Sequence, residues 1–178
     1  KDVAPAIAAL HQVGIPVLFN FTAGLDLRAL DRHLGYFSQG GLGLPDVPYY
    51  SKPEYQKIRD AYVAYATKLL ELSGMPAAEA ATQATDILAF EARLAKVSKS
   101  SEEFSRDVGL YYNPISPADA DKLSPNFPFT KLFESQGVAV PALFSLSVPA
   151  YHAEVSKMPA AVPAAQPAAQ KVALLEGV

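Results

Sequence analysis

The sequence predicts a mainly α fold, in which a hairpin of two long helices and several short helices accompany a small antiparallel β-hairpin near the N-terminus. Apolar residues recur at steps of three and four over residues 55–72 and 83–97, which is the helical period. Residues 17–23 and 33–38 are short runs rich in apolar and aromatic residues, as is typical of strands. Between these regions, residues 39–50 hold three glycines and two prolines, which neither a helix nor a central strand accommodates.

The composition is that of one globular domain. The chain has 178 residues, of which 50% are hydrophobic and 19% charged, enough to bury a core. Its net charge is -3, from 15 basic and 18 acidic residues mixed along the chain. The lack of a basic stripe argues against a nucleic-acid or anionic-membrane partner. No cysteine is present, which excludes disulfides, thiolate catalysis and cysteine-ligated zinc.

The chain starts at Lys1 rather than Met, and no apolar run approaches the roughly 18 residues of a membrane span. We therefore expect that a targeting segment has been removed or that the chain begins inside a longer protein. Residues 2–13 follow with apolar positions at helical spacing and predict a short helix that stops at Gly14. His11, on this helix, is expected to be exposed.

The next residues predict the β-hairpin. Its first strand is expected over residues 17–23, where Phe19 and Phe21 alternate with polar neighbours. The second is expected over 33–38, with a long connection around 25–31. Because two strands alone are marginally stable in water, this hairpin needs another surface to cover it.

Residues 39–50, which we call the Gly/Pro bend, are expected to form a shaped corner closed by two tyrosines. Gly41 and Gly43 could suggest a phosphate-binding loop, but no third glycine follows at the dinucleotide spacing and no Gly-Lys-Ser/Thr sequence follows. We therefore interpret the bend as an architectural joint. Its candidate positions are Gly40, Gly41, Leu42, Leu44, Pro45, Asp46, Tyr49 and Tyr50.

The first long helix is expected after the bend. Ser51 can cap it, Pro53 suits its first turn, and Gly74 is its expected end. One apolar stripe is expected to be its buried face: Tyr55, Ile58, Tyr62, Tyr65, Leu69 and Leu72. The tyrosines could also form a ladder for ligand stacking, but a half-buried aromatic stripe is the interpretation that we adopt.

The second long helix is expected over residues 78–97, and the short Gly-Met-Pro link before it predicts an antiparallel helical hairpin. Glu91 falls at the edge of its apolar face, and a buried carboxylate needs a partner. We expect Arg106 to be that partner, in a structural ion pair. The alternative, Glu91 as a general base, lacks a nearby nucleophile or metal-binding motif.

The C-terminal third predicts short elements. Arg106 and Asp107 are followed by a second aromatic corner that contains Tyr112 and Asn113. Residues 138–148 are β-prone, and Pro141 is expected to confine them to a sheet edge or a loop. Short helices are expected over residues 116–123, 129–135 and 149–157.

The last residues differ in kind from the rest. Residues 159–178 are rich in proline and alanine, which is linker composition. Residues 160–169 are expected to be extended and mobile unless a partner holds them, and residues 171–176 could form one last helical turn. The chain is thus expected to divide into a helix-rich region, residues 1–158, and this tail.

Motifs that carry chemistry are missing. The three histidines, at 11, 33 and 152, lie far apart, and the sequence contains neither His-Glu-x-x-His nor Gly-x-Ser-x-Gly. A zinc site built from three distant residues is the remaining alternative. We therefore assign no catalytic and no metal-binding residue in this chain.

Several blocks nevertheless resemble, in order, the N-terminal region of the neprilysin-type zinc metallopeptidases, which include endothelin-converting enzymes and bacterial oligopeptidases. The resemblance covers roughly residues 15–135, and its most specific block is the Gly/Pro bend. The other blocks are Leu18-Phe19-Asn20-Phe21, Asp26, Tyr62, Leu69 to Gly74, Glu91-Ala92-Arg93-Leu94-Ala95, Arg106-Asp107, Tyr112-Asn113-Pro114 and Pro125 to Phe129.

The resemblance implies a piece of an exported or membrane-tethered zinc endopeptidase, periplasmic if bacterial, whose two helical lobes enclose a chamber for peptides. In that family the zinc ligands lie in the C-terminal part. This chain is then expected to supply scaffold and chamber wall, to be inactive alone, to hold no zinc itself, and to have the C-terminal catalytic lobe as its partner. The alternative is a stand-alone, non-catalytic helical binding module. For a fragment we also expect self-association, through the helical hairpin or the aromatic corner.

Overall fold

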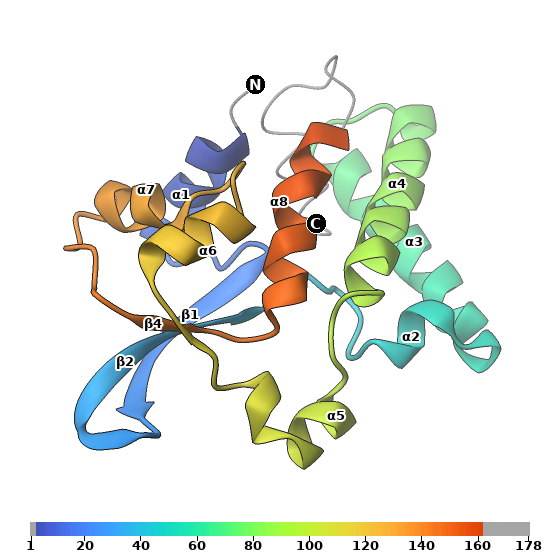
Figure 1. Cartoon of the computed structure of the whole chain (residues 1–178). Coiled ribbons are helices and arrows are strands. Elements are labelled where there is room, and N and C mark those ends of the chain that lie inside the picture. Colours follow the sequence, from blue (N-terminus) through green and yellow to red (C-terminus); the bar gives the residue numbers. More distant parts are fainter. Residues whose placement is uncertain (1–2, 162–178) are drawn as a thin grey trace.

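The computed structural model describes residues 3–161 as a small sheet under short helices, with a helical hairpin at its side (Figure 1). The mainly α fold class is confirmed. In chain order the elements are α1 (Val3–Gln12), β1 (Phe19–Asp26), β2 (Ala29–Gln39), α2 (Pro48–Ser51), η1 (Pro53–Tyr55), α3 (Gln56–Leu72), α4 (Ala77–Ala95), α5 (Ser101–Arg106), η2 (Val108–Leu110), β3 (Pro114–Ile115), α6 (Pro117–Leu123), α7 (Phe129–Ser135), β4 (Phe144–Leu146) and α8 (Pro149–Ala161).

The predicted β-hairpin is present and belongs to a four-stranded sheet in the order β1-β2-β4-β3. β1 and β2 are antiparallel, β4 runs parallel to β2, and β3 is antiparallel to β4. The expected long connection over residues 25–31 was wrong, because only Leu27 and Arg28 separate the two strands. The Asp26 carboxylate accepts a hydrogen bond from the Arg28 amide at 2.9 Å and so stabilises this tight turn.

The main core lies between one face of the sheet and helices α1, α6, α7 and α8 (Figure 1). At its centre aromatic rings pack edge to face: Phe37 lies 5.5 Å from Phe19, 5.0 Å from Phe129 and 5.2 Å from Phe144 between ring centroids. Such pairs contribute roughly 0.5–1.5 kcal/mol each beyond the area that they bury. This core is the surface that the isolated hairpin lacked.

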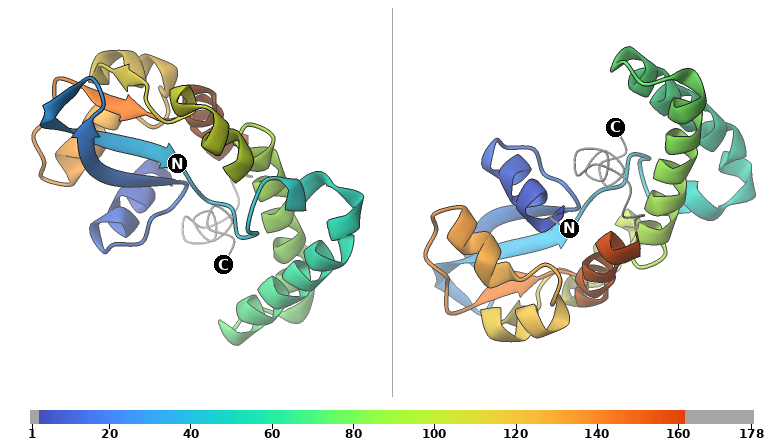
Figure 2. Two further views of the ribbon diagram at one scale, coloured as in Figure 1. Left: turned by 90° about the horizontal axis from the view of Figure 1, so that it is seen from below. Right: turned by 90° about the horizontal axis from the view of Figure 1, so that it is seen from above.

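The predicted hairpin of long helices is also present, and Figure 2 shows α3 and α4 side by side, projecting from the sheet. Its small core is built from Ala66 and Leu70 of α3 and from Ala80, Ala84 and Ile87 of α4. Alanine at three of these five positions lets the two helices approach closely. α4 continues past this core, because Leu94 near its C-terminal end belongs to the main core.

The start of α3 and its predicted buried face need correction. The expected helix is divided into η1 and α3, and the short helix α2 occupies the end of the Gly/Pro bend, where no helix was expected. Ser51 is therefore the last residue of α2 rather than a cap. Three residues of the expected stripe point to solvent: Ile58 is 40% exposed, Tyr65 59% and Leu72 73%. The buried face is rotated toward Ala66 and Leu70, because α4 meets α3 along these residues.

Two further expectations were wrong, and a third holds in part. Pro141 lies in a loop, as expected, but the strand that follows it, β4, is not at the sheet edge, since it pairs with β2 on one side and β3 on the other. His11 is half-buried rather than exposed, because its ring stacks on Phe19 with 4.5 Å between centroids. The last helix, α8, runs to Ala161 instead of 157. The rest of the expected tail lies outside the described residues.

Candidate functional site

The Gly/Pro bend leads the chain from β2 to α2 through positions that require glycine. Gly41 has φ of 70°, a backbone conformation that residues with a Cβ rarely adopt. Gly43 has a different reason: a Cβ there would lie 2.1 Å from Tyr62 Oη. The bend therefore passes too close to α3 for any side chain at residue 43.

A buried carboxylate, Glu91 of α4, fastens the bend. Its Oε2 accepts hydrogen bonds from the Tyr50 hydroxyl at 2.5 Å and from the Gly43 amide at 3.1 Å. Its Oε1 accepts one from the Tyr62 hydroxyl at 2.6 Å. The Leu44 amide in turn donates to Tyr50 Oη at 2.8 Å. Glu91 thus ties together the bend, α2, α3 and α4.

The electrostatics of this cluster favour a structural role for Glu91 over a catalytic one. Burial raises the pKa of Glu91, and the hydrogen bonds from Tyr50, Tyr62 and the Gly43 amide partly offset that increase. Burial also raises the pKa of Tyr50 and Tyr62, and the carboxylate beside them raises it further. Both tyrosines therefore remain protonated donors, and the carboxylate is engaged on both oxygens.

The expected ion pair between Glu91 and Arg106 was wrong. Arg106 lies at the exposed end of α5 and pairs with Glu102 one turn earlier. In place of Arg106, three uncharged donors surround Glu91: the Gly43 amide and the hydroxyls of Tyr50 and Tyr62. No motif in the sequence marks Tyr50 and Tyr62 as these donors, because tyrosines at helical spacing are equally typical of an ordinary apolar face.

Polar contacts hold the rest of the bend. Asp46 accepts from the Ser101 amide at the start of α5. The Gln39 side chain forms hydrogen bonds with both the amide and the carbonyl of Lys99. Tyr49 stacks on Tyr55 with 4.2 Å between ring centroids. The remaining candidate positions differ in burial: Leu44 is buried, Leu42 is half-buried, and Pro45 is exposed.

The second aromatic corner forms a separate cluster around Asp26, one of the residues that carry the resemblance. Asp26 is inaccessible to solvent and accepts hydrogen bonds from Tyr112, the Arg28 amide and Arg32. These bonds, that of Tyr112 foremost, lower the pKa of Asp26 to about 2. The sequence offered one signal for this cluster, because an aspartate often accepts a hydrogen bond from the amide two residues later in a turn, as Asp26 does from Arg28.

The other predicted positions near this corner shape the backbone. Asp107 accepts from the Gly109 amide at 2.8 Å. The Asn113 side chain donates to the Gly109 carbonyl at 2.8 Å. Together with Tyr112 these residues fold the segment between α5 and β3, which is distant in sequence from the bend.

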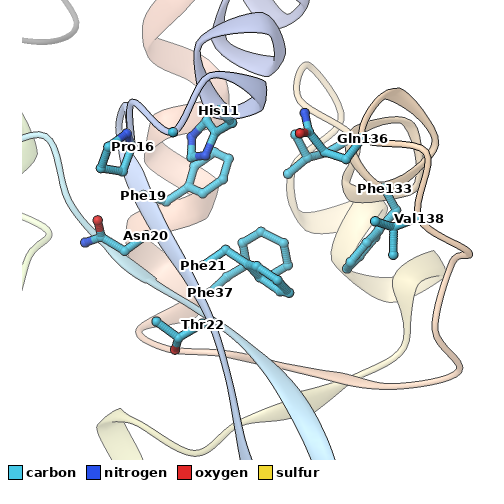
Figure 3. A pocket seen from close by; sticks show the side chains of 12 residues that line it. His11, Pro16, Phe19, Asn20, Phe21, Thr22, Phe37, Phe133, Gln136 and Val138 are labelled. Atoms are coloured by element: carbon cyan, nitrogen blue, oxygen red, sulfur yellow. The ribbon is translucent and has the colours of Figure 1, made fainter.

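A cavity of about 680 Å³ opens between α1, β1 and α7 (Figure 3). Its walls are mainly apolar, with Phe21, Phe37 and Phe133 among them. Two of its polar side chains are engaged with the backbone: His11 Nε2 lies 3.0 Å from the Val17 carbonyl, and Gln136 donates to the Ala8 carbonyl at 2.9 Å. The shape and lining of the cavity suit an apolar group.

Within residues 3–161, no three histidine, aspartate or glutamate side chains lie close enough to hold a metal ion. The residues described here therefore do not fit the zinc that the resemblance implies for the whole enzyme. None of the helices within residues 3–161 has the length and apolar character needed to cross a bilayer.

Sequence comparison identifies relatives among peptidases. The chain is 36% identical over 98 residues to the neutral endopeptidase of Lactobacillus helveticus, which covers 55% of this chain and 15% of that protein. It is 29% identical over 120 residues to neprilysin-3 of Drosophila melanogaster, which covers 66% and 15%. The chain therefore spans only a small part of the length of these relatives.

Structure comparison finds the same fold in larger enzymes. The inhibitor complex of the Mycobacterium tuberculosis zinc metalloprotease Zmp1 matches with a TM-score of 0.83 and 22% identity, over 97% of this chain and 26% of that one. PepO from Lactobacillus rhamnosis matches with a TM-score of 0.74 and 16% identity, over 98% and 27%. A family model for the N-terminal region of peptidase family M13 matches residues 1–169. This chain belongs to peptidase family M13.

Proposed function

We propose that this chain is the non-catalytic N-terminal region of a zinc-dependent metalloendopeptidase that hydrolyses peptides. The match of the family model to residues 1–169 carries the proposal. The chain spans 15% of the curated relatives above and about a quarter of the solved structures. Its role is to provide scaffold and chamber wall for a catalytic lobe encoded elsewhere in the protein.

The state of the two buried carboxylates supports a scaffolding role. A general base needs a free lone pair within reach of its substrate. Glu91 instead receives three donors and Asp26 is surrounded by Tyr112, Arg28 and Arg32. Both are also removed from solvent. In this proposal the zinc and the residues that bind it belong to the partner lobe.

Peptide cleavage by the purified chain tests the proposal. The 178-residue chain, saturated with zinc and then desalted, is incubated with an internally quenched peptide library, beside the complete gene product. We expect no cleavage and no retained zinc for the chain, and cleavage by the complete protein that a chelator abolishes. Peptide cleavage together with one tightly held zinc per chain would show that the chain is itself a hydrolase.

A stand-alone binding module is the second candidate, and the apolar cavity between α1, β1 and α7 favours it. The intact mass of the native gene product separates the two candidates. A product that ends at Val178 supports the binding module, while a longer one that contains His-Glu-x-x-His supports the peptidase.

Export from the cytoplasm and self-association complete the proposal. Localisation of the tagged native protein outside the cytoplasm supports the first, and retention inside contradicts it. Self-association is expected because Ile58, Tyr65 and Leu72 leave an apolar stripe on α3 open to solvent.

A further inference from the structure

The first turn of α8 is held by a joint that involves distant parts of the chain. The Tyr151 hydroxyl lies 2.5 Å from the Leu18 carbonyl oxygen and 2.7 Å from that of Gly40. Leu18 directly precedes β1, and Gly40 directly follows β2 at the start of the Gly/Pro bend. One side chain of α8 thus holds both ends of the β-hairpin.

The backbone at this joint is strained. Leu18 has φ of 64° and Val148, which directly precedes α8, has φ of 48°. Among residues 3–161 these are the only residues other than glycine with positive φ. The conformation is unfavourable for any residue with a Cβ, most of all for a β-branched one such as Val148. Such residues persist only while the surrounding contacts hold them.

His152, the next residue of α8, is buried at the same joint without full hydrogen bonding. It is 2% exposed, and rings of Phe19, Phe129 and Tyr151 pack around it with centroids 5.4–6.3 Å away. One ring nitrogen bonds to the Ser147 carbonyl. The other, Nε2, has no hydrogen-bond partner in the part of the chain that the structure describes. A neutral imidazole tolerates this site better than an imidazolium, which would bury an unsatisfied N–H and a charge.

The surrounding elements provide no carboxylate for a charged His152. Of the rings that contact it, only Tyr151 is titratable, and its hydroxyl faces backbone carbonyls. On the neighbouring helix α4, Arg93 forms an ion pair with Glu154 of α8 at 2.7 Å. The charged and titratable groups of the other helices packed nearby are engaged or exposed. On α1, His11 lies beside the Val17 carbonyl, and on α6 Asp119 pairs with Lys122 while Asp121 accepts from Thr130. On α7, Lys131 and Glu134 are exposed.

We propose that this joint is an acid-sensitive latch, in which protonation of His152 releases the first turn of α8 from β1 and from the Gly/Pro bend. Protonation requires the imidazole to reach water, and α8 must move for this to happen. Release also lets Leu18 and Val148 return to favourable backbone angles. The strained residues and the unpartnered imidazole therefore act in the same direction.

The direction and size of the effect follow from linkage. Desolvation lowers the pKa of His152 from 6.5 to about 3 in the closed state, while an open state restores the ordinary value. The closed state is thus fully favoured above pH 6.5 and loses its advantage as pH falls toward 3. Well below pH 6.5 the opening equilibrium constant rises about tenfold per pH unit, and between pH 6.5 and 4.5 it rises roughly 50-fold in all.

Hydrogen exchange measured by mass spectrometry tests the latch in the 178-residue chain at pH 7 and pH 4.5, with correction for the intrinsic exchange rate. We expect protection to fall at the acidic pH in peptides that cover residues 144–158 and 16–20, while α3 and α4 keep theirs. His152→Phe should remove this difference. The matched control, His33→Gln, changes an exposed histidine of β2 and should retain it.

Equal loss of protection in all elements, no loss in residues 144–158, or an unchanged acid response in His152→Phe would each overturn the latch. If that variant does not fold, NMR of the unmodified chain replaces it. Amide signals of the first turn of α8 should then broaden or shift together with protonation of His152. Protonation of His152 near pH 6.5 with α8 unchanged would equally overturn the proposal.

Discussion

Single residues show how environment decides the behaviour of a buried carboxylate. Hydrogen bonds from Tyr112, the Arg28 amide and Arg32, that of Tyr112 foremost, lower the pKa of Asp26 to about 2, and Arg32 adds a positive charge beside it. Glu91 has only uncharged donors, and burial raises its pKa. Both carboxylates hold distant segments together, but only Asp26 is stabilised in its charged form relative to the unfolded chain. Their substitutions therefore have different expected effects.

Replacement of Glu91 by leucine leaves two tyrosine hydroxyls and the Gly43 amide without their acceptor. We expect Glu91→Leu to lower the free energy of unfolding by about 3 kcal/mol, since each buried group left unsatisfied costs about 1–3 kcal/mol and the added apolar side chain offsets part of this. Glu91→Gln keeps an acceptor oxygen and should cost less than about 1 kcal/mol. Urea unfolding at pH 7 measures both.

Glu102→Gln, at an exposed ion pair, is the control and should change stability by less than about 1 kcal/mol. Equal losses for the leucine and glutamine variants would contradict the role of the carboxylate as acceptor.

Acid unfolding reports on Asp26. A pKa lowered from 3.8 to about 2 means that Asp26 stabilises the fold above pH 3.8 and loses this contribution as pH falls toward 2. We expect Asp26→Asn to be less stable at pH 7 and to show a weaker pH dependence between pH 4 and 2. Circular dichroism at a series of pH values measures this. Glu134→Gln, at an exposed position of α7, should reproduce the parent curve, and an unchanged curve for Asp26→Asn would count against the assignment.

At the scale of elements, α3 has two apolar sides with different roles. One side, with Ala66 and Leu70, packs on α4. The other carries Ile58, Tyr65 and Leu72 at intervals of seven residues and faces solvent. An apolar stripe of this kind is typical of a surface that another protein segment covers.

Polar substitutions along the exposed stripe should reduce self-association. We expect the triple variant Ile58→Lys, Tyr65→Gln and Leu72→Lys to sediment as a monomer at concentrations where the parent chain associates. Its melting temperature should stay within a few degrees, because these side chains lie outside both cores. Sedimentation velocity across a concentration series measures the effect. Leu30→Gln, 68% exposed on β2, is the control and should associate as the parent does. A parent chain that is monomeric throughout the series would contradict self-association.

At the scale of the whole molecule, α4 connects the two parts of the fold. Ile87 belongs to the core of the helical hairpin, Leu94 to the main core, and Ala95 to the packing under the Gly/Pro bend. Glu91 lies between them in sequence, and Arg93 pairs with α8. A single helix, α4, thus contributes side chains both to the core over the sheet and to the core of the helical hairpin.

Truncation of Leu94 should therefore destabilise both parts together. Leu94 is fully buried, and we expect Leu94→Ala to lower the free energy of unfolding by about 2–5 kcal/mol. Helical and aromatic circular dichroism should report the same midpoint in urea. The control Leu72→Ala, at a leucine 73% exposed, should cost less than about 1 kcal/mol. Separate midpoints for the two signals would show that the hairpin and the sheet unfold independently.

The sequence alone determined the elements whose signals are local. The long helices follow from their apolar period, the position of the Gly/Pro bend follows from its glycines and prolines, and the β-hairpin follows from the aromatic runs that contain Phe19 and Phe37. The bend also carried the resemblance to the family, which the comparisons confirm. Local propensity and glycine chemistry act within a few residues, so the order of residues is sufficient to reveal them.

Only the tertiary structure decided which residues meet. It gave Glu91 the hydroxyls of Tyr50 and Tyr62 instead of Arg106, turned Ile58, Tyr65 and Leu72 of α3 to solvent, and placed β4 inside the sheet. These outcomes depend on how α2, α3 and α4 pack against one another. They also depend on strands such as β2 and β4, which pair although they are more than a hundred residues apart in sequence. Such contacts are set by the joint burial of several elements, which a periodic pattern along one element cannot specify.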